Sequence, residues 1–111
     1  FKETKPKIVK KDVDIQSLKI AVRDLNDEDI KKRNLNKKTK GVVITEISNR
    51  SPLANLLSVN DIIIEVQKTS VKNSNDLNKI VDGIFKKGEK TLLLTIINNN
   101  NRRRYLGVKI N

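Results

Sequence analysis

Two apolar runs joined by a Ser-Pro pair constrain this chain more than any other feature. They lie in residues 41–66, which read GVVITEISNRSPLANLLSVNDIIIEV. Short runs rich in Val and Ile predict strands, here Gly41–Ser48 and Ile62–Val66. Ser51 followed by Pro52 is typical of a helix start, because Pro loses no hydrogen bond at the first helical position. We therefore expect a strand, a short helix that closes one end of the core, and a second strand.

The rest of the chain also divides into short elements, because its apolar residues recur with strand and helix spacings. The other predicted elements are a strand over Leu18–Val22, a helix capped by Asn26 and ending around Asn34, a helix capped by Ser74 and ending before Gly88, and strands over Lys90–Ile97 and Arg103–Ile110 joined by a turn at Asn98–Asn101. Asn and Ser suit the caps because their side chains accept hydrogen bonds from first-turn amides. This order predicts a mainly β domain of the α+β class, with five or six strands and two helices.

The length of 111 residues fits a single domain. Phe1–Lys11 is rich in Lys, has one Pro and shows no periodicity, which is typical of a linker. We therefore assign residues 1–14 to a basic linker and residues 15–111 to the domain. Aromatic residues make up only 3% of the chain, so the core must be built from Ile, Leu and Val.

The formal net charge of +11 raises the question of an anionic partner, such as nucleic acid or a membrane surface. The basic residues are scattered, however, and Lys, Asn and Ile recur throughout, which suggests the compositional bias of an AT-rich genome. Neither Arg102–Arg104 nor the lysines of residues 37–40 are interleaved with aromatic side chains for base stacking. The arginine run also fits an edge strand protected by charge. We do not expect a nucleic-acid partner, and a basic nucleic-acid-binding domain stays as the alternative.

The chain contains no His and no Cys. It therefore cannot supply a Ser-His-Asp triad, a Cys-His pair, a disulfide or a Cys/His metal site. No apolar run approaches the roughly 18 residues of a membrane helix, and no signal peptide is recognised at Phe1. The start within a Lys-rich segment suggests a fragment of a longer protein. We expect no enzymatic activity, no cofactor, no metal and no membrane span in this chain.

The order of motifs from Ser17 to Ile110 resembles the PDZ domains of Do-like (HtrA) serine proteases. That family has an apolar-Gly-apolar loop and strand, then GVVVxxV, SPAAxAGLxxGDxI, a VNGxxV turn, a helix with an Asp-Leu pair, and a final hairpin. The segment LKIAVRDLNDEDIKKRNL, Leu18–Leu35, is similar to the start of the second PDZ domain in such proteases. The resemblance implies a PDZ-like, partly open β-barrel or sandwich.

The sequence departs from the family at four positions where Gly is usual. Lys19 stands in the loop, Asn60 precedes Asp61, Gln67 and Lys68 replace an Asn-Gly turn, and SPLANLL lacks the Gly before its last Leu. Asn60 is a mild replacement, because Asn tolerates a left-handed backbone. Lys19 could narrow or block the carboxylate site, or its ammonium could pair with a carboxylate.

The resemblance implies a groove that binds peptides by β-augmentation. In this mode an extended peptide pairs with the loop strand, and loop amides hold its terminal carboxylate. Transferred to this chain, the loop is Ser17, Leu18, Lys19 and Ile20, one wall is Ile20 and Val22, and the other wall is Ser74, Asn78 and Val81. Each position has an alternative role: the apolar residues also fit the core, Ser74 a helix cap, Lys19 a surface charge, and Asn78 an exposed surface.

The resemblance further implies the peptide-binding domain of a periplasmic serine endopeptidase of protein quality control, with catalytic residues on a separate domain. The expected partners are peptides, unfolded protein segments, and other domains and subunits of the parent protease. Second PDZ domains of the family often hold oligomers together, so an assembly role stays open beside substrate binding. A PDZ module of another membrane-associated protease or of a secretion protein is a further alternative.

Overall fold

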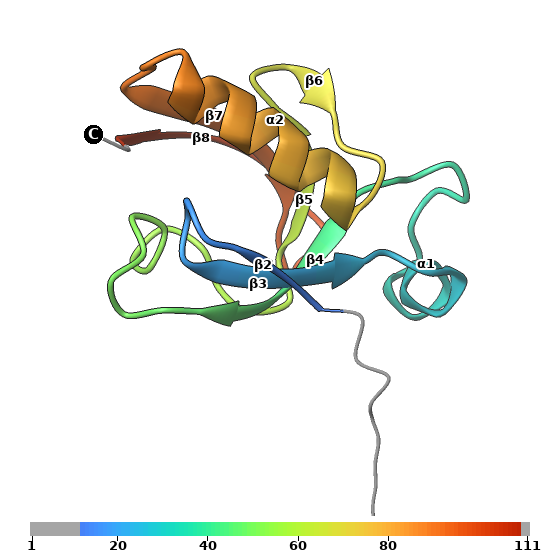
Figure 1. The fold of residues 1–111 in the computed structure, drawn as a ribbon. Helices are drawn as coiled ribbons and strands as arrows, with labels where there is room; N and C mark the ends of the chain where they lie inside the picture. Colours follow the sequence, from blue (N-terminus) through green and yellow to red (C-terminus); the bar gives the residue numbers. More distant parts are fainter. Residues whose placement is uncertain (1–11, 110–111) are drawn as a thin grey trace, which may run out of the picture.

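The chain folds into one antiparallel seven-stranded sheet and two helices (Figure 1), in a computed structural model that describes residues 12–109. The elements are β2 (Val13–Ile15), β3 (Ile20–Asp24), α1 (Asp27–Arg33), β4 (Val42–Ile47), β5 (Ile62–Val66), β6 (Thr69–Ser70), α2 (Ser74–Lys86), β7 (Thr91–Ile97) and β8 (Arg103–Lys109). The predicted α+β class is confirmed, and the short strands β2 and β6 bring the strand number above the predicted five or six. Phe1–Lys11, within the predicted linker, lies outside the described residues.

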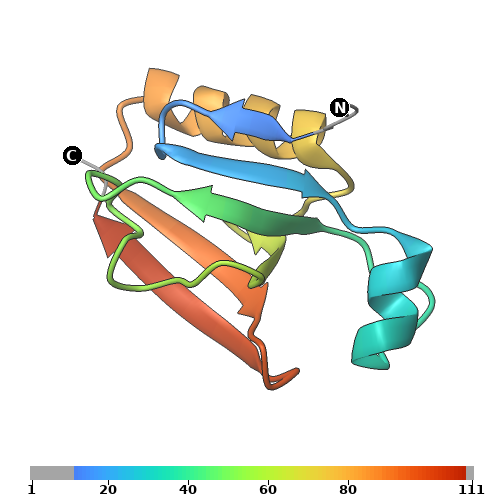
Figure 2. The same ribbon diagram turned by 90° about the horizontal axis from the view of Figure 1, so that it is seen from below.

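The strands follow the order β2-β3-β4-β5-β7-β8, and β6 pairs with β5 beside this path. The sheet curves, and α2 lies across its concave side (Figures 1 and 2). The main core fills the space between the sheet and α2. Its fully buried members include Ile15, Leu18, Val22, Ile44 and Val81.

A second apolar cluster covers the opposite face of the sheet. It consists of Val43, Ile62, Ile64 and Ile97, and the half-buried Leu25 and Leu35 beside α1 pack against it. Alternate residues of a strand point to opposite faces, so Ile63 joins the main core while its two neighbours join the second cluster. This burial on both faces explains the unbroken apolar run in β5.

The predicted helix after Ser51 is wrong in conformation but right in position. Residues 51–56 form consecutive turns, in which the Ala54 N–H donates to the Ser51 carbonyl (3.1 Å) and the Leu56 N–H to the Leu53 carbonyl (3.0 Å). Among the backbone hydrogen bonds of this segment, only that of the Leu57 N–H reaches four residues back, to the Leu53 carbonyl (3.0 Å), so the α-helical pattern does not repeat. Leu53 and Leu57 are still buried in the main core, so the segment closes the core as expected.

The first strands differ from the prediction by a few residues. β3 begins at Ile20, whereas Leu18 and Lys19 lie in the turn before it. β2 begins at Val13, so the last two residues of the predicted linker pair with β3. A three-residue strand carries almost no periodicity, and its partner strand rather than its own sequence holds it in place.

Candidate functional site

The predicted carboxylate loop is the turn that joins β2 to β3, and it uses its own amides. The Leu18 N–H donates to the Ile15 carbonyl (3.0 Å), and the Lys19 N–H donates to the Gln16 carbonyl (3.2 Å). Ser17 is half-buried in this turn, and Ile20 is the first residue of β3. Two of the four amides in the predicted carboxylate loop are therefore bonded to carbonyls of the chain itself.

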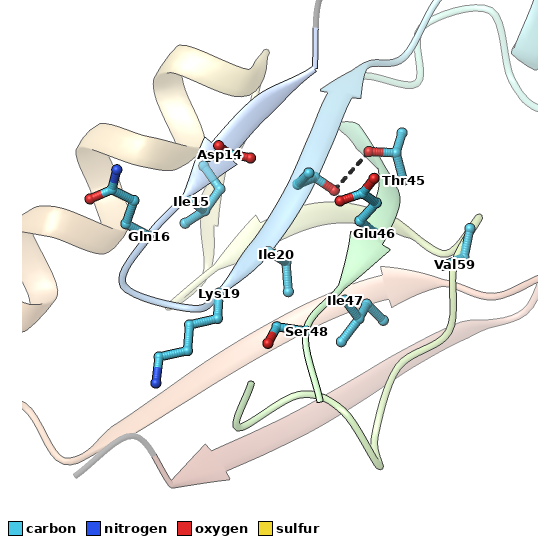
Figure 3. A pocket seen from close by; sticks show the side chains of 11 residues that line it. Asp14, Ile15, Gln16, Lys19, Ile20, Thr45, Glu46, Ile47, Ser48 and Val59 are labelled. Atoms are coloured by element: carbon cyan, nitrogen blue, oxygen red, sulfur yellow. Dashed lines mark hydrogen bonds between the residues drawn. The ribbon is translucent and has the colours of Figure 1, made fainter. Parts of the chain in front are cut away.

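Lys19 adopts the left-handed backbone conformation for which the family uses Gly. Its φ is 56°, and its carbonyl accepts a hydrogen bond from the Ser48 N–H (3.0 Å). The side chain is exposed and extends from the turn away from β3 (Figure 3). Lys19 thus keeps the loop conformation without Gly, at the strain that an L-residue carries in this region.

Ser51 holds the loop in place through a side-chain hydrogen bond, a role that the sequence did not predict. Its hydroxyl donates to the Leu18 carbonyl and accepts from the Leu53 N–H (3.0 Å). The residue is 7% exposed, so both bonds are shielded from water. The sequence identified Ser51 only as a helix start, because its contact with Leu18 spans 33 positions of the chain.

The two apolar residues of the predicted β3 wall are core residues. Ile20 and Val22 are 4% and 0% exposed and belong to the main core under α2. Of the alternatives left open by the sequence, the structure favours the core position for both. The backbone edge of β3 that faces away from β4 pairs with β2.

The prediction that Ser74 caps α2 is wrong. The N-cap of α2 is Asn73, whose side chain accepts from the Asp76 N–H (2.8 Å), and Ser74 is the first helical residue. Ser74 instead donates its N–H (2.8 Å) and its hydroxyl (2.6 Å) to the Asp24 carboxylate at the end of β3. This pair of bonds joins the two predicted walls.

Asn78 and Val81, the other predicted residues of α2, lie at different depths. Asn78 is half-buried, whereas Val81 is fully buried in the main core. Since residues three apart in a helix lie on one face, both lie on the side of α2 that approaches the sheet. Val81 therefore forms the floor of the site and Asn78 its margin.

β2 lies between the two walls, beside β3 and next to α2 (Figure 2). It runs antiparallel to β3, with Val13 opposite Val22, Asp14 opposite Ala21 and Ile15 opposite Ile20. The Ile15 side chain is fully buried in the same cluster as Leu18 and Val81. The space between β3 and α2 thus holds an extended strand whose last residue lies at the loop.

An open surface hollow of about 620 Å³ lies over β2, β3 and β4 near the β2–β3 turn (Figure 3). Its lining includes Asp14, Ala21, Glu46 and Val59, together with Lys19 and Ile20 from the predicted loop. The Thr45 hydroxyl donates to the Ala21 carbonyl on this side (3.1 Å). Ile15 of β2 also lines it, so this hollow borders the strand site between β3 and α2, although most of the predicted groove residues lie elsewhere.

An ion pair joins β3 to α1. The two guanidinium nitrogens of Arg23 lie 2.7 and 2.9 Å from the two carboxylate oxygens of Asp29. The hydrogen bond from Arg23 lowers the pKa of Asp29, with help from the Asn26 N–H and against the effect of burial. The same hydrogen bond raises the pKa of Arg23. Asn26 caps α1 as predicted, since its side chain accepts from the Asp29 N–H (2.9 Å).

Within residues 12–109, no helix is long and apolar enough to span a membrane.

No protein-family model and no curated protein matches the sequence. Among solved structures, the chain is similar to the HtrA3 PDZ domain bound to a phage-derived ligand (FGRWV), with a TM-score of 0.58 and 21% sequence identity. The match covers 81% of this chain and 77% of that one. A likeness at this identity bears on the fold, and the chain accordingly has a PDZ-like fold.

Proposed function

We propose that this domain binds extended peptide segments by β-augmentation at the β3 edge. One observation carries the proposal: the space between β3 and α2 already holds an extended, antiparallel strand, β2. A site that accepts Val13–Ile15 has the backbone partners and the apolar floor that a peptide of similar pattern needs. The HtrA3 PDZ domain, which has the same fold, was crystallised with a peptide ligand.

Peptide titration of the full chain tests this proposal. A labelled peptide with an apolar last residue and a free carboxylate is compared with its amidated twin, with backbone amide NMR as the readout. We expect shifts in β3, in the loop over residues 17–20 and in α2. We expect none in β8, which lies at the opposite edge of the sheet from β2. Shifts confined to other surfaces, or no shifts at high peptide concentration, would refute the proposal.

We also propose that the domain belongs to a Do-like serine endopeptidase of the periplasm, where it serves protein quality control. Support comes from the motif order over residues 41–66 and from the structural likeness to an HtrA3 PDZ domain. The catalytic residues would then lie on another domain. Sequencing the same gene beyond this chain tests the idea: a Gly-Asn-Ser-Gly-Gly segment is expected, whereas a His-Glu-x-x-His helix would indicate a different membrane-associated protease.

A role in assembly is the second candidate. Leu56, Val59 and Tyr105 are 48%, 44% and 65% exposed, so these apolar side chains are accessible for contact with other domains or subunits. Light scattering of the parent protein tests this role, and replacement of Tyr105 and Leu56 by Ser is expected to shift it toward smaller species. An unchanged assembly would contradict it.

A further inference from the structure

We propose that β2 is a built-in occupant of the peptide groove, so that Val13–Ile15 compete with external peptides for the β3 edge. The inference rests on the proposed function and concerns the regulation of the same site. β3 already pairs with β4 on its other side. A strand has two edges, so a peptide can pair with β3 only after β2 has left.

The direction of β2 is that of a bound C-terminal peptide. β2 runs antiparallel to β3 and ends at the loop, where Ile15 lies opposite Ile20. A peptide captured by its carboxylate would also run antiparallel to β3 and would end at this loop. Ile15 thus takes the place of the last residue of a ligand, and Val13 takes the place of the residue two before it.

The backbone bonds of the loop fit the same interpretation. The Ile15 carbonyl accepts the Leu18 N–H, and the Gln16 carbonyl accepts the Lys19 N–H. These carbonyl oxygens satisfy the donors that would otherwise be available to the oxygens of a carboxylate. Release of β2 would therefore free both a strand edge and the loop amides.

The side chains of β2 alternate as those of a groove ligand should. Val13 is half-buried against the main core, Asp14 is exposed, and Ile15 is fully buried. Ile15 belongs to the same buried cluster as Leu18 and Val81. An external competitor should accordingly present apolar side chains at its last and third-last positions.

β2 is short enough to be exchanged. Only three of its residues are in register with β3, so release of β2 breaks few backbone bonds, although it also exposes the Ile15 side chain. A competitor within the chain lowers the apparent peptide affinity in proportion to the fraction of molecules whose groove is open. We therefore expect weak binding by the unmodified chain, and roughly tenfold or tighter binding once β2 is released.

A reversible cross-link tests whether β2 must move. The chain has no Cys, and Asp14 lies directly opposite Ala21. Paired residues in antiparallel strands have Cα separations that suit a disulfide. The variant Asp14→Cys/Ala21→Cys holds β2 on β3 when oxidised and allows it to leave when reduced. The control Thr91→Cys/Lys109→Cys places an equivalent cross-link between β7 and β8.

The probe is a labelled peptide that ends in Val-Asp-Ile with a free carboxylate, measured by fluorescence anisotropy with and without reductant. Oxidation of the β2 cross-link is expected to weaken binding by roughly tenfold or more, because it holds the groove closed. Oxidation of the control should have no effect. Equal binding by the oxidised and reduced β2 variant would overturn the inference and leave peptide binding itself intact.

A third variant separates this failure from failure of the proposed function. Val13→Ser/Ile15→Ser keeps the full chain length but removes the apolar side chains that hold β2 in the groove. Circular dichroism verifies that it folds. We expect it to bind the peptide roughly tenfold more tightly than the unmodified chain. If this folded variant and the reduced cross-link variant both fail to bind the peptide, the proposed function is wrong, and the inference about β2 is wrong as well.

Discussion

Replacement of Ile15 by Ala should weaken folding and strengthen peptide binding at the same time. Ile15 is fully buried in β2, and truncation to Ala removes three carbons from the core. At about 0.8 kcal/mol for each buried methylene, the lost burial is roughly 2.4 kcal/mol. If β2 is released without global unfolding, the same change lowers the free energy of opening the groove. Since about 1.4 kcal/mol corresponds to a tenfold change, peptide affinity should rise by roughly 10- to 50-fold.

Ile44→Ala is the matched control, because Ile44 is also fully buried in the main core but lies in β4. It should destabilise the domain by about 2–5 kcal/mol and should not increase peptide affinity. Urea unfolding followed by circular dichroism gives the stabilities, and anisotropy of the peptide that ends in Val-Asp-Ile gives the affinities. Competition between β2 and the peptide is refuted if Ile15→Ala binds the peptide no more tightly than the unmodified chain does. It is also refuted if Ile44→Ala raises the peptide affinity by as much as Ile15→Ala does.

Three further substitutions test the loop and its surroundings by urea unfolding. Lys19→Gly should stabilise the domain by about 0.5–1 kcal/mol, because Gly relieves the left-handed strain at a φ of 56°, and an unchanged or lower midpoint would contradict this. Ser51→Ala should cost about 1–3 kcal/mol by leaving buried groups without partners, whereas Ser48→Ala, at an exposed turn, should cost much less; equal losses would refute the buried role. Asp29→Asn should cost about 1–2 kcal/mol at pH 7, and the difference should shrink as the pH falls below about 4. The sign follows from the lowered pKa of Asp29, since the carboxylate that Arg23 stabilises is lost on protonation, and a pH-independent difference would contradict it.

The sequence was most informative where long apolar runs are flanked directly by polar residues. The runs of β4, β5 and β7 predicted strands at the observed places, and the helical spacing after Ser74 predicted α2. Asn60 was expected to tolerate a left-handed backbone, and its φ is 81°. These features depend on local propensity and burial, which a single sequence carries.

Side-chain contacts between distant segments could not be predicted in this way. Asn73 and Ser74 are both good cap residues, but Asn73 caps α2, and Ser74 binds Asp24, 50 positions away. The turn at Gln67 and Lys68 lacks the expected Gly, yet both residues have positive φ. The Gln67 side chain compensates, because its Oε1 accepts the Leu93 N–H of β7 (2.9 Å).

In the candidate site too, the sequence predicted local elements but not how distant segments come together. The residues that the resemblance assigned to the loop form the turn before β3 and the start of β3, and those assigned to the helix wall lie on α2, but the resemblance gave no sign that β2 lies between them. The three residues of β2, just upstream of the loop, pair with the edge of β3 that the resemblance assigned to a peptide. β2 has three residues, too few for its pattern to be distinguished in the sequence from the basic segment before it.

Hydrogen exchange of the full chain, with and without the peptide that ends in Val-Asp-Ile, shows whether a peptide displaces β2 from β3. If the peptide replaces β2 on β3, the amides of Val13–Ile15 should lose protection on peptide addition while those of β3 stay protected. The amides of Leu18 and Lys19 should also stay protected, because the peptide carboxylate takes over their bonds. Peptide binding that leaves the exchange of Val13–Ile15 unchanged would contradict the account and would place the binding site elsewhere.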